Sequence, residues 1–228
     1  MRSTHSPIHP DWLLWQLADS AFPTGGFAYS AGLEAAVQLG EVCDAATLEA
    51  FCRASLTQLA RQSLPLLLAV HADPDRLPDL DRYCNAMLSN HVANRASRAQ
   101  GQALLLAMER AFAHHCPALA TLRHTVRRAA LPGHLAPLFG GVANGLRLDA
   151  DDAARLFTFT ALRDLISAAV RLNVVGPLHA QAMQHALGRH AQAAATASPD
   201  AAAATSAAPV LELLQAHQDR LYSRLFHS

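Results

Sequence analysis

The stretch DADDAARLFTFTALRDLISAAVRLN, residues 149–173, carries the clearest structural pattern in the chain. Aspartates at its start suit the positive end of a helix dipole. Large apolar residues then recur every three or four positions, which is the spacing of one face of an α-helix. The pattern therefore predicts a central helix over these residues, with an apolar stripe that faces the core. The stripe consists of Leu156, Phe159, Leu162, Ile166, Ala169 and Val170.

The rest of the chain also indicates helices. Alanine, the best helix former, supplies 48 of the 228 residues, whereas tyrosine and β-branched residues are scarce. Asp44 suits a helix N-cap and Pro65 suits a helix end. A chain of this length can bury one sizeable core. We therefore expect an all-α fold, a single compact helical domain. Further helices are expected over residues 12–18, 30–40, 45–64, 90–115, 117–130 and 177–195, with one more entered through the turn at 71–83.

The charge balance and the cysteines limit the possible partners and the compartment. The formal net charge is zero, so no overall field directs the chain to nucleic acid or to an anionic membrane. The four cysteines are scattered without a Cys-x-x-Cys pair, which indicates a reducing environment. No apolar run approaches the ~18 residues of a membrane span, and the run at 12–17 is too short for a secretory leader. We expect a cytoplasmic protein that binds neither nucleic acid nor membrane.

A second unusual stretch, ADSAFPTGGFAYSAGLEAA, residues 18–36, places a glycine turn between two helical segments. Pro23 fixes one backbone angle, and Gly25 and Gly26 allow conformations closed to other residues, so the turn has a defined shape. A phosphate-binding loop would need a lysine after the glycines. The chain contains no lysine, since all 18 residues of the Lys and Arg total are arginine. This excludes a Walker loop, Schiff-base lysine chemistry and a Ser-Lys nucleophile pair.

No spacing of polar residues indicates a catalytic or metal site. The densest histidine cluster is His114-His115-Cys116, but adjacent helical residues point about 100° apart and cannot close one tetrahedral site. No glutamate is followed three residues later by histidine, which excludes a Glu-x-x-His di-iron bundle. Ser30 lacks the flanking glycines of a nucleophile elbow. We expect no catalytic residue and no metal ligand; the open alternatives are a Ser/His/Asp triad assembled by the fold and a His-based metal site.

Arginines in the middle of the chain admit two interpretations. They form either a basic patch for nucleic acid or a nucleotide-loaded partner, or a solvated helix face with local ion pairs, which the zero net charge favours. The arginines are Arg95, Arg98, Arg123, Arg127 and Arg128.

Beside the glycine turn, we expect Asp19 to accept hydrogen bonds from backbone N–H groups and Glu34 to lie on a helix surface.

Composition divides the chain into three parts. Residues 1–195 carry the helical pattern, and residues 196–209 form a low-complexity stretch without a large apolar residue. Such a stretch has nothing to bury, so it predicts a flexible linker. Residues 210–228 are again rich in large apolar side chains. This C-terminal tail must cover them, either by folding back on the helical domain or by docking on a partner.

Five segments together resemble the UreF family of urease accessory proteins. The longest is LLWQLADSAFPTGGFAYSAGLEAA, residues 13–36, which contains the glycine turn. The others follow in the family's order and span nearly the whole chain, so the resemblance is specific. They are NRASRAQGQALL from residue 94, FGGVANGL from 139, SAAVRLNVVGPLHAQ from 167 and HQDRLYSRLFHS from 217.

The resemblance implies an all-α homodimer without catalytic activity that helps to insert nickel into urease. In that family the protein bridges the scaffold protein UreD, also called UreH, and the GTPase UreG, and it meets the urease apoprotein through this complex. Nickel and GTP are then expected on the partner proteins, and this chain holds no cofactor. The family's C-terminal tail becomes ordered against the scaffold and against its own N-terminal region.

Carried onto this sequence, the resemblance marks partner-binding residues in the glycine turn and the tail. Within this hypothesis, Arg224 donates to backbone or hydroxyl acceptors near residues 27–30 and so locks the tail onto the turn. The alternatives are a generic all-α interaction protein and a cryptic His-based metal-binding protein, both unrelated to urease. The marked residues are Phe22, Pro23, Thr24, Gly25, Gly26, Phe27, Tyr29, Ser30, Tyr222, Ser223, Arg224, Leu225 and Phe226.

Overall fold

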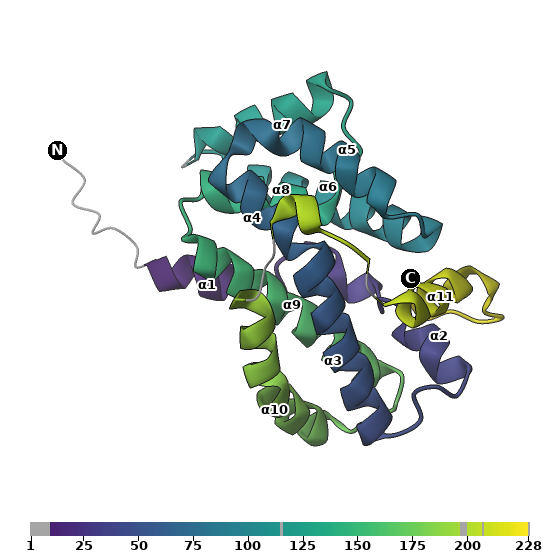
Figure 1. Ribbon diagram of the computed structural model, residues 1–228. Helices are drawn as coiled ribbons and strands as arrows, with labels where there is room; N and C mark the ends of the chain where they lie inside the picture. Colours follow the sequence, from purple (N-terminus) through teal and green to yellow (C-terminus); the bar gives the residue numbers. More distant parts are fainter. Residues whose placement is uncertain (1–9, 115, 197–199, 207, 228) are drawn as a thin grey trace.

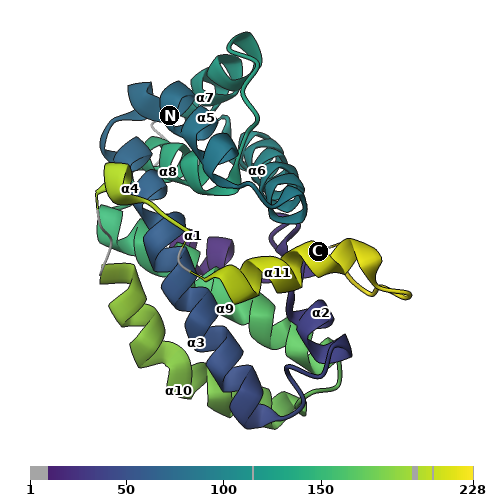
Figure 2. The same ribbon diagram turned by 45° about the vertical axis from the view of Figure 1, so that its right-hand side comes forward.

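The computed structural model describes residues 10–114, 116–196, 200–206 and 208–227. Within these residues every regular element is helical, which confirms the all-α prediction. The helices pack in two layers (Figures 1 and 2). No helix of the described part combines the length and the apolar character needed to cross a membrane.

The lower layer is built around α9 (Ala150–Arg171), against which α10 (Pro177–Thr196) and α3 (Ala45–Gln62) pack. Asp149 is the N-cap residue of α9, as the sequence predicts. The Asp44 carboxylate accepts a hydrogen bond from the N–H of Thr47 at 2.8 Å, which completes a capping box at the start of α3. This cap explains why the start of α3 could be located from sequence, whereas Asp149 makes no side-chain cap hydrogen bond and favours the start of α9 through the helix dipole.

One member of the predicted stripe on α9 is not in the core. Phe159 is 42% exposed, whereas Phe157 is buried and packs edge to face on Phe139 of the upper layer, with ring centroids 5.1 Å apart. Helix α9 contacts both the upper layer and its two neighbours in the lower layer. Its buried face is therefore broader than a single stripe and includes Phe157, and Phe159 lies at its edge.

The upper layer is centred on α8 (Leu135–Gly145), which is absent from the helices expected from the sequence. Glycines such as those in its middle ordinarily disfavour a helix interior. The glycines are required by packing. A Cβ added to Gly140 would lie 2.1 Å from the carbonyl oxygen of Leu67, and one on Gly141 would lie 2.9 Å from a methyl group of Leu122. Gly140 thus lets α8 approach the backbone of α4 (Leu64–Ala72), and Gly141 leaves room for a side chain of α7 (Pro117–Arg128). Helix α8 also packs against α5 (Leu77–Met87) and α6 (His91–Phe112).

The start of α8 is held by a buried polar cluster. The Asp81 carboxylate accepts hydrogen bonds from the backbone N–H groups of Gly133 and His134 at 2.9 and 2.7 Å. The Ser97 hydroxyl accepts one from the N–H of Leu135 at 3.2 Å. Gly101, one turn further along α6, lies so close that an added Cβ would be 2.2 Å from the Gly133 carbonyl oxygen. The segment NRASRAQGQALL therefore serves to seat α6 against α8.

The two ends of the described chain pack beside the layers. Helix α1 (Pro10–Ala18) packs on α9, and α2 (Leu33–Gln38) packs on α9 and on α11 (Pro209–His217). In the segment that joins α10 to α11, the N–H of Thr205 donates to the carbonyl of Arg61 at 3.1 Å, and this segment's flexibility stays a prediction. The tail folds back on the domain, which is the first of the two possibilities left open by the sequence.

Candidate partner-binding site

The glycine turn is shaped by two glycines with different tasks. Gly25 adopts a left-handed conformation with φ of 79°, which favours glycine, and it starts the short 3-10 helix η1 (Gly26–Ala28). Gly26 packs against α9, where an added Cβ would lie 2.2 Å from a carboxylate oxygen of Asp164. Burial raises the pKa of Asp164, and its ion pair with Arg163 at 2.7 Å opposes that rise. The turn therefore packs closely against the Asp164 carboxylate of the central helix α9.

Glu34, which was expected on a helix surface, is buried, and this prediction was wrong. Its side chain lies under the C-terminal tail and is 2% exposed. One carboxylate oxygen accepts the N–H of Leu225 at 2.6 Å; the other accepts the N–H of Phe226 at 3.1 Å and the side-chain amide of Gln218 at 2.6 Å. Hydrogen bonds to an ionised carboxylate are stronger than neutral ones. Glu34 is thus a clasp that holds two successive backbone N–H groups of the tail.

Arg171, at the end of α9, is the second element of the clasp. Its guanidinium carbon lies 3.8 Å from the ring centroid of Phe27 and 4.1 Å from that of Phe226, so the cation is held between turn and tail. It also donates a hydrogen bond to the carbonyl of Phe27. Alongside, the N–H of His227 donates to the carbonyl of Ala28 at 2.9 Å. Sequence reasoning missed Arg171, although it lies within the motif that begins at residue 167.

The role assigned to Arg224 in the sequence analysis was wrong. Arg224 donates to the Asp219 carboxylate at 3.2 Å, and Arg171 satisfies the acceptor on the turn. Asp219 also binds Arg95 at 2.8 Å and His91 at 3.1 Å. The hydrogen bond from Arg95 is the main reason why the pKa of Asp219 lies below its ordinary value. This exposed cluster ties the base of the tail to the start of α6.

The other marked residues either anchor the junction or face solvent. Phe22 stacks on Phe112 with centroids 6.1 Å apart, and the carbonyl of Ser223 accepts the side-chain amide of Gln38 at 3.0 Å. Ser30 is buried. In contrast, Tyr222 is fully exposed. The structure thus joins turn and tail into one surface. Its exposed residues are Pro23, Gly25, Phe27, Tyr222, Ser223, Arg224 and Leu225, and Thr24 and Tyr29 are half-buried.

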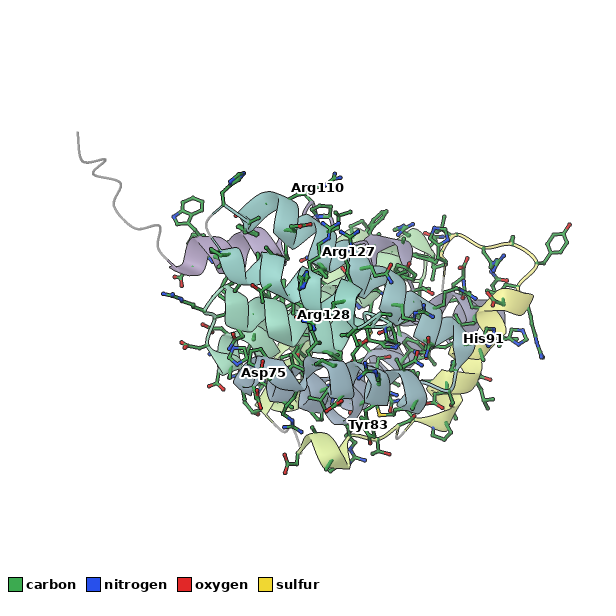
Figure 3. The ribbon with its side chains drawn as sticks, turned by 90° about the horizontal axis from the view of Figure 1, so that it is seen from above. Asp75, Tyr83, His91, Arg110, Arg127 and Arg128 are labelled. Atoms are coloured by element: carbon green, nitrogen blue, oxygen red, sulfur yellow. The ribbon has the colours of Figure 1, made fainter. Side chains whose placement is uncertain are left out.

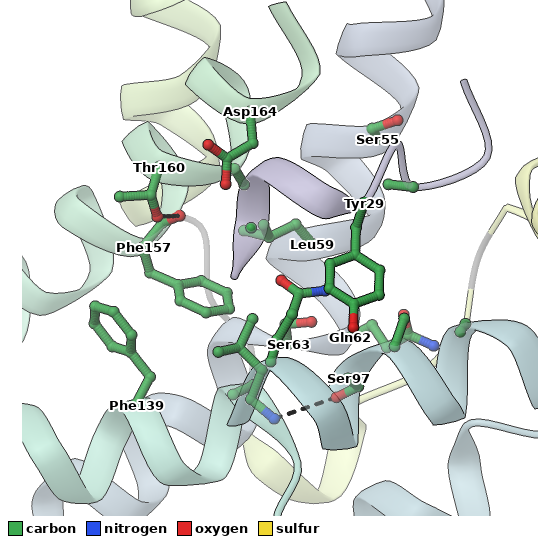
Figure 4. A pocket seen from close by; sticks show the side chains of 18 of the residues that line it. Tyr29, Ser55, Leu59, Gln62, Ser63, Ser97, Phe139, Phe157, Thr160 and Asp164 are labelled. Atoms are coloured by element: carbon green, nitrogen blue, oxygen red, sulfur yellow. Dashed lines mark hydrogen bonds between the residues drawn. The ribbon is translucent and has the colours of Figure 1, made fainter. Parts of the chain in front are cut away.

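A cavity of about 270 Å³ lies between the layers beneath this surface. Figure 4 shows Tyr29 of the turn, Asp164 and Thr160 of α9, and side chains of α3 and α6 around it. The lining is mostly apolar, with a few polar groups among aromatic and aliphatic side chains. Leu211 and Gln215 of α11 also line it. The cavity is therefore enclosed in part by the same C-terminal segment that docks on the turn.

The described residues hold one serine–histidine pair near this cavity. Ser97 Oγ lies 3.2 Å from Nδ1 of His134, whose Nε2 lies 3.2 Å from the amide oxygen of Asn85. The nearby Asp81 binds backbone N–H groups and not the imidazole ring. His134 is fully buried, and desolvation lowers its pKa. The hydroxyl and the carboxylate both accept from the backbone at the start of α8, so the pair has a structural role.

The remaining candidates from the sequence analysis fall on helix surfaces and ends. Asp19 accepts a hydrogen bond from the N–H of Ala21 at 2.9 Å, as expected. His114 and Cys116 are described and His115 lies outside the described residues; the Cys116 thiol donates to the carbonyl of Gly145 at 2.9 Å. Among described residues, no three His, Cys, Asp or Glu side chains converge on a point where a metal could bind.

Comparison with known proteins gives a consistent result. The sequence model of the UreF family matches residues 42–188. Urease accessory protein F of Oryza sativa subsp. indica is 37% identical over 223 residues, which cover 96% of this chain and 85% of the rice protein. Urease accessory protein F of Arabidopsis thaliana is 37% identical over 222 residues, covering 95% of this chain and 92% of that protein. The chain belongs to the UreF family. A more distant member, urease accessory protein UreF of Kocuria rhizophila, is 29% identical over 226 residues.

Membership in the UreF family confirms the resemblance derived from the five motifs. The part matched by the family model, residues 42–188, holds the two packed layers and ends before the tail. The glycine turn precedes residue 42 and also lies outside this match. Full-length alignment with the plant UreF proteins nevertheless covers 95% or more of the chain. The junction of turn and tail is therefore a feature at the periphery of the UreF core.

Proposed function

We propose that this chain supports urease maturation by bridging the UreD/UreH scaffold and the UreG GTPase during GTP-dependent nickel insertion. In this proposal it acts in the cytoplasm as a homodimer, and the partner proteins hold the nickel and the GTP. Membership in a family of urease accessory proteins supports the general role. The observation that carries the finer proposal is the docking of the C-terminal tail on the glycine turn by Glu34 and Arg171.

This junction has the properties of a preformed binding surface. Phe27 is 60% exposed and Leu225 is 55% exposed, although the backbone of each is held by the clasp. Aromatic and aliphatic side chains on a fixed backbone bind a partner without a large ordering cost. Tyr222 adds a fully exposed ring with a polar tip, a combination enriched at protein interfaces. We assign this surface to the scaffold protein.

The non-catalytic role is supported by what the polar groups do. The buried carboxylates Asp81 and Glu34 each accept two backbone N–H groups, and the Ser97 hydroxyl accepts a third at the start of α8. Side chains that accept hydrogen bonds from backbone N–H groups in this way stabilise the fold, and this use differs from proton transfer to a substrate. The chain would then act by holding partners together, and any GTP hydrolysis would take place in the partner.

The test uses cells that carry a urease operon whose own F component is deleted. The intact chain, the chain ending at Asp219 and the Tyr222→Ala variant are expressed, and urease activity, urease nickel content and co-purification with the scaffold are measured. We expect the intact chain to restore activity and the truncated chain to fail, with Tyr222→Ala binding the scaffold less tightly. Glu41→Gln, an exposed change next to α2, is the control.

Two outcomes would contradict the proposal. If a soluble intact chain neither restores activity nor co-purifies with the accessory partners, the bridging role is wrong. If the isolated chain binds nickel tightly in a stoichiometric complex, the assignment of the metal to the partners is wrong.

A further inference from the structure

Charge is distributed very unevenly along this neutral chain. Residues 91–148, which form α6, α7 and α8, contain seven arginines and a single acidic residue, Glu109. The remainder contains eleven arginines and seventeen acidic residues. A net charge of zero therefore hides a basic segment over α6, α7 and α8 and an acidic remainder, and it is the local field that a partner meets at close range.

The basic charge gathers on one face, where α6 and α7 lie side by side. Glu109 of α6 forms an ion pair with Arg123 of α7, and the amide of Gln102 donates to the carbonyl of Pro132 at 3.3 Å, just beyond α7. These two contacts show that the helices run antiparallel. Arg127 lies one turn beyond Arg123, so it falls between the two contacts. Figure 3 looks down on this face and labels Arg110, Arg127 and Arg128 on it.

An exposed row on α6 completes the face. Residues at intervals of four lie on one side of a helix. Leu106, in the middle of the row, is a large apolar residue that is 40% exposed. We name these residues, together with Arg127 and Arg128, the arginine face. The row consists of Arg98, Gln102, Leu106 and Arg110, and all four are exposed.

The arginines of this face are not neutralised by the described part of the chain. Arg95 and Arg123 have acidic partners in Asp219 and Glu109, as the solvated-face interpretation predicted. Within the described residues, Arg98, Arg110, Arg127 and Arg128 form no ion pair within 4.0 Å. Arg127 and Arg128 complement the negative end of the α7 dipole, and both residues are exposed.

We propose that the arginine face binds an acidic protein segment, a helix with carboxylates around one apolar residue that covers Leu106. Guanidinium groups pair with carboxylates in a two-pronged geometry, and an apolar contact at the centre gives such a pairing its anchor. Nucleic acid fits less well, because the phosphate backbone that guanidinium groups contact offers no apolar partner for Leu106. This inference does not rest on the bridging proposal.

The test measures binding of three labelled probes to the purified full-length chain by fluorescence anisotropy. The first is a 20-residue helical peptide with glutamates flanking a central leucine, the second is its glutamine counterpart, and the third is a 20-base-pair DNA duplex. We expect the glutamate peptide to bind, more weakly as salt rises, and the glutamine peptide to bind at least about tenfold less tightly. The variant Arg110→Gln/Arg127→Gln should weaken binding about 3- to 10-fold.

A charge-matched control separates this face from general basicity. Arg76→Gln/Arg189→Gln removes two exposed arginines elsewhere, and we expect it to leave peptide binding unchanged. An equal loss of affinity for the glutamate peptide in both double variants would overturn the proposal. A glutamate peptide that does not bind the unchanged chain would overturn it as well. Tighter binding of DNA than of the glutamate peptide, lost in Arg110→Gln/Arg127→Gln, would replace the acidic segment with nucleic acid. Leu106→Ala should weaken peptide binding without changing its salt dependence.

Discussion

Replacing Glu34 with glutamine keeps the volume of the buried clasp and removes its charge. The carboxylate holds the N–H of Leu225 at 2.6 Å and that of Phe226 at 3.1 Å through different oxygens. A glutamine has one acceptor oxygen, so one of the two N–H groups would face an amide N–H. Loss of a hydrogen bond to a charged group costs about 1.5–3 kcal/mol. We expect the ratio of docked to undocked tail to fall roughly 10- to 150-fold.

Hydrogen exchange at the amides of Leu225 and Phe226 measures this ratio directly, because both must leave the carboxylate before they exchange. Tryptic cleavage after Arg224 gives a second readout, which intact mass resolves. The variant should exchange and be cleaved faster, whereas the helices of the two layers should keep their protection. Glu41→Gln removes an exposed carboxylate seven positions after Glu34 in the sequence, and this variant should exchange and be cleaved as the unchanged chain is. Unchanged exchange at both amides in Glu34→Gln would refute the clasp.

Three further predictions concern the two layers. Gly140→Ala should destabilise the chain by about 3 kcal/mol in urea unfolding, because its Cβ would lie 2.1 Å from a backbone oxygen, whereas Gly188→Ala, with no atom within 4 Å, should stabilise it slightly. Iodoacetamide at pH 8 should modify the exposed Cys43 and spare Cys52, whose pKa burial raises to about 12; mass spectrometry checks this. The pKa of buried His134 is lowered, so below the unfolded value near 6.5 only the unfolded chain takes up this proton. The urea concentration at the midpoint of unfolding should therefore decrease as the pH is lowered from 7 to 5. A His134→Asn variant should show a smaller decrease.

Local signals in the sequence located much of the fold. Asp44 marks a helix start because its side chain caps the backbone a few residues away, and Asp149 marks one because an acidic residue favours the positive end of the helix dipole. The family resemblance likewise follows from contiguous motifs, and it pointed to the turn and the tail. Helix α8 was not predicted, and Gly140 within it is required by the backbone of Leu67, 73 residues earlier in the chain. A requirement imposed by a distant segment leaves no periodicity in the sequence.

The same reasoning explains the errors at the candidate site. Glu34 stands in the first turn of a short helix, where an acidic residue is ordinarily a surface residue that favours the helix dipole. Its actual partners lie 191 and 192 residues away. Arg171 and Arg224 are equivalent as donors in a sequence, and only the fold decides that Arg171 reaches Phe27. Long-range polar pairs of this kind need the three-dimensional structure.

The structure of the clasp also determines how firmly the tail is held. The last residues of the tail, 221–227, are attached by a small set of groups. They are the Glu34 carboxylate, the Arg171 guanidinium between two rings, the buried ring of Phe226, one side-chain hydrogen bond to the carbonyl of Ser223 and one backbone hydrogen bond from His227, while Tyr222 and Leu225 remain in solvent. A segment with few buried apolar contacts opens at a lower free energy than the core. A partner that covers Tyr222 and Leu225 binds the docked tail and not the open one, so it must stabilise the docked form by mass action. Partner binding should therefore slow amide exchange at Leu225 and Phe226, and faster exchange in the complex would show that the partner binds the released tail instead.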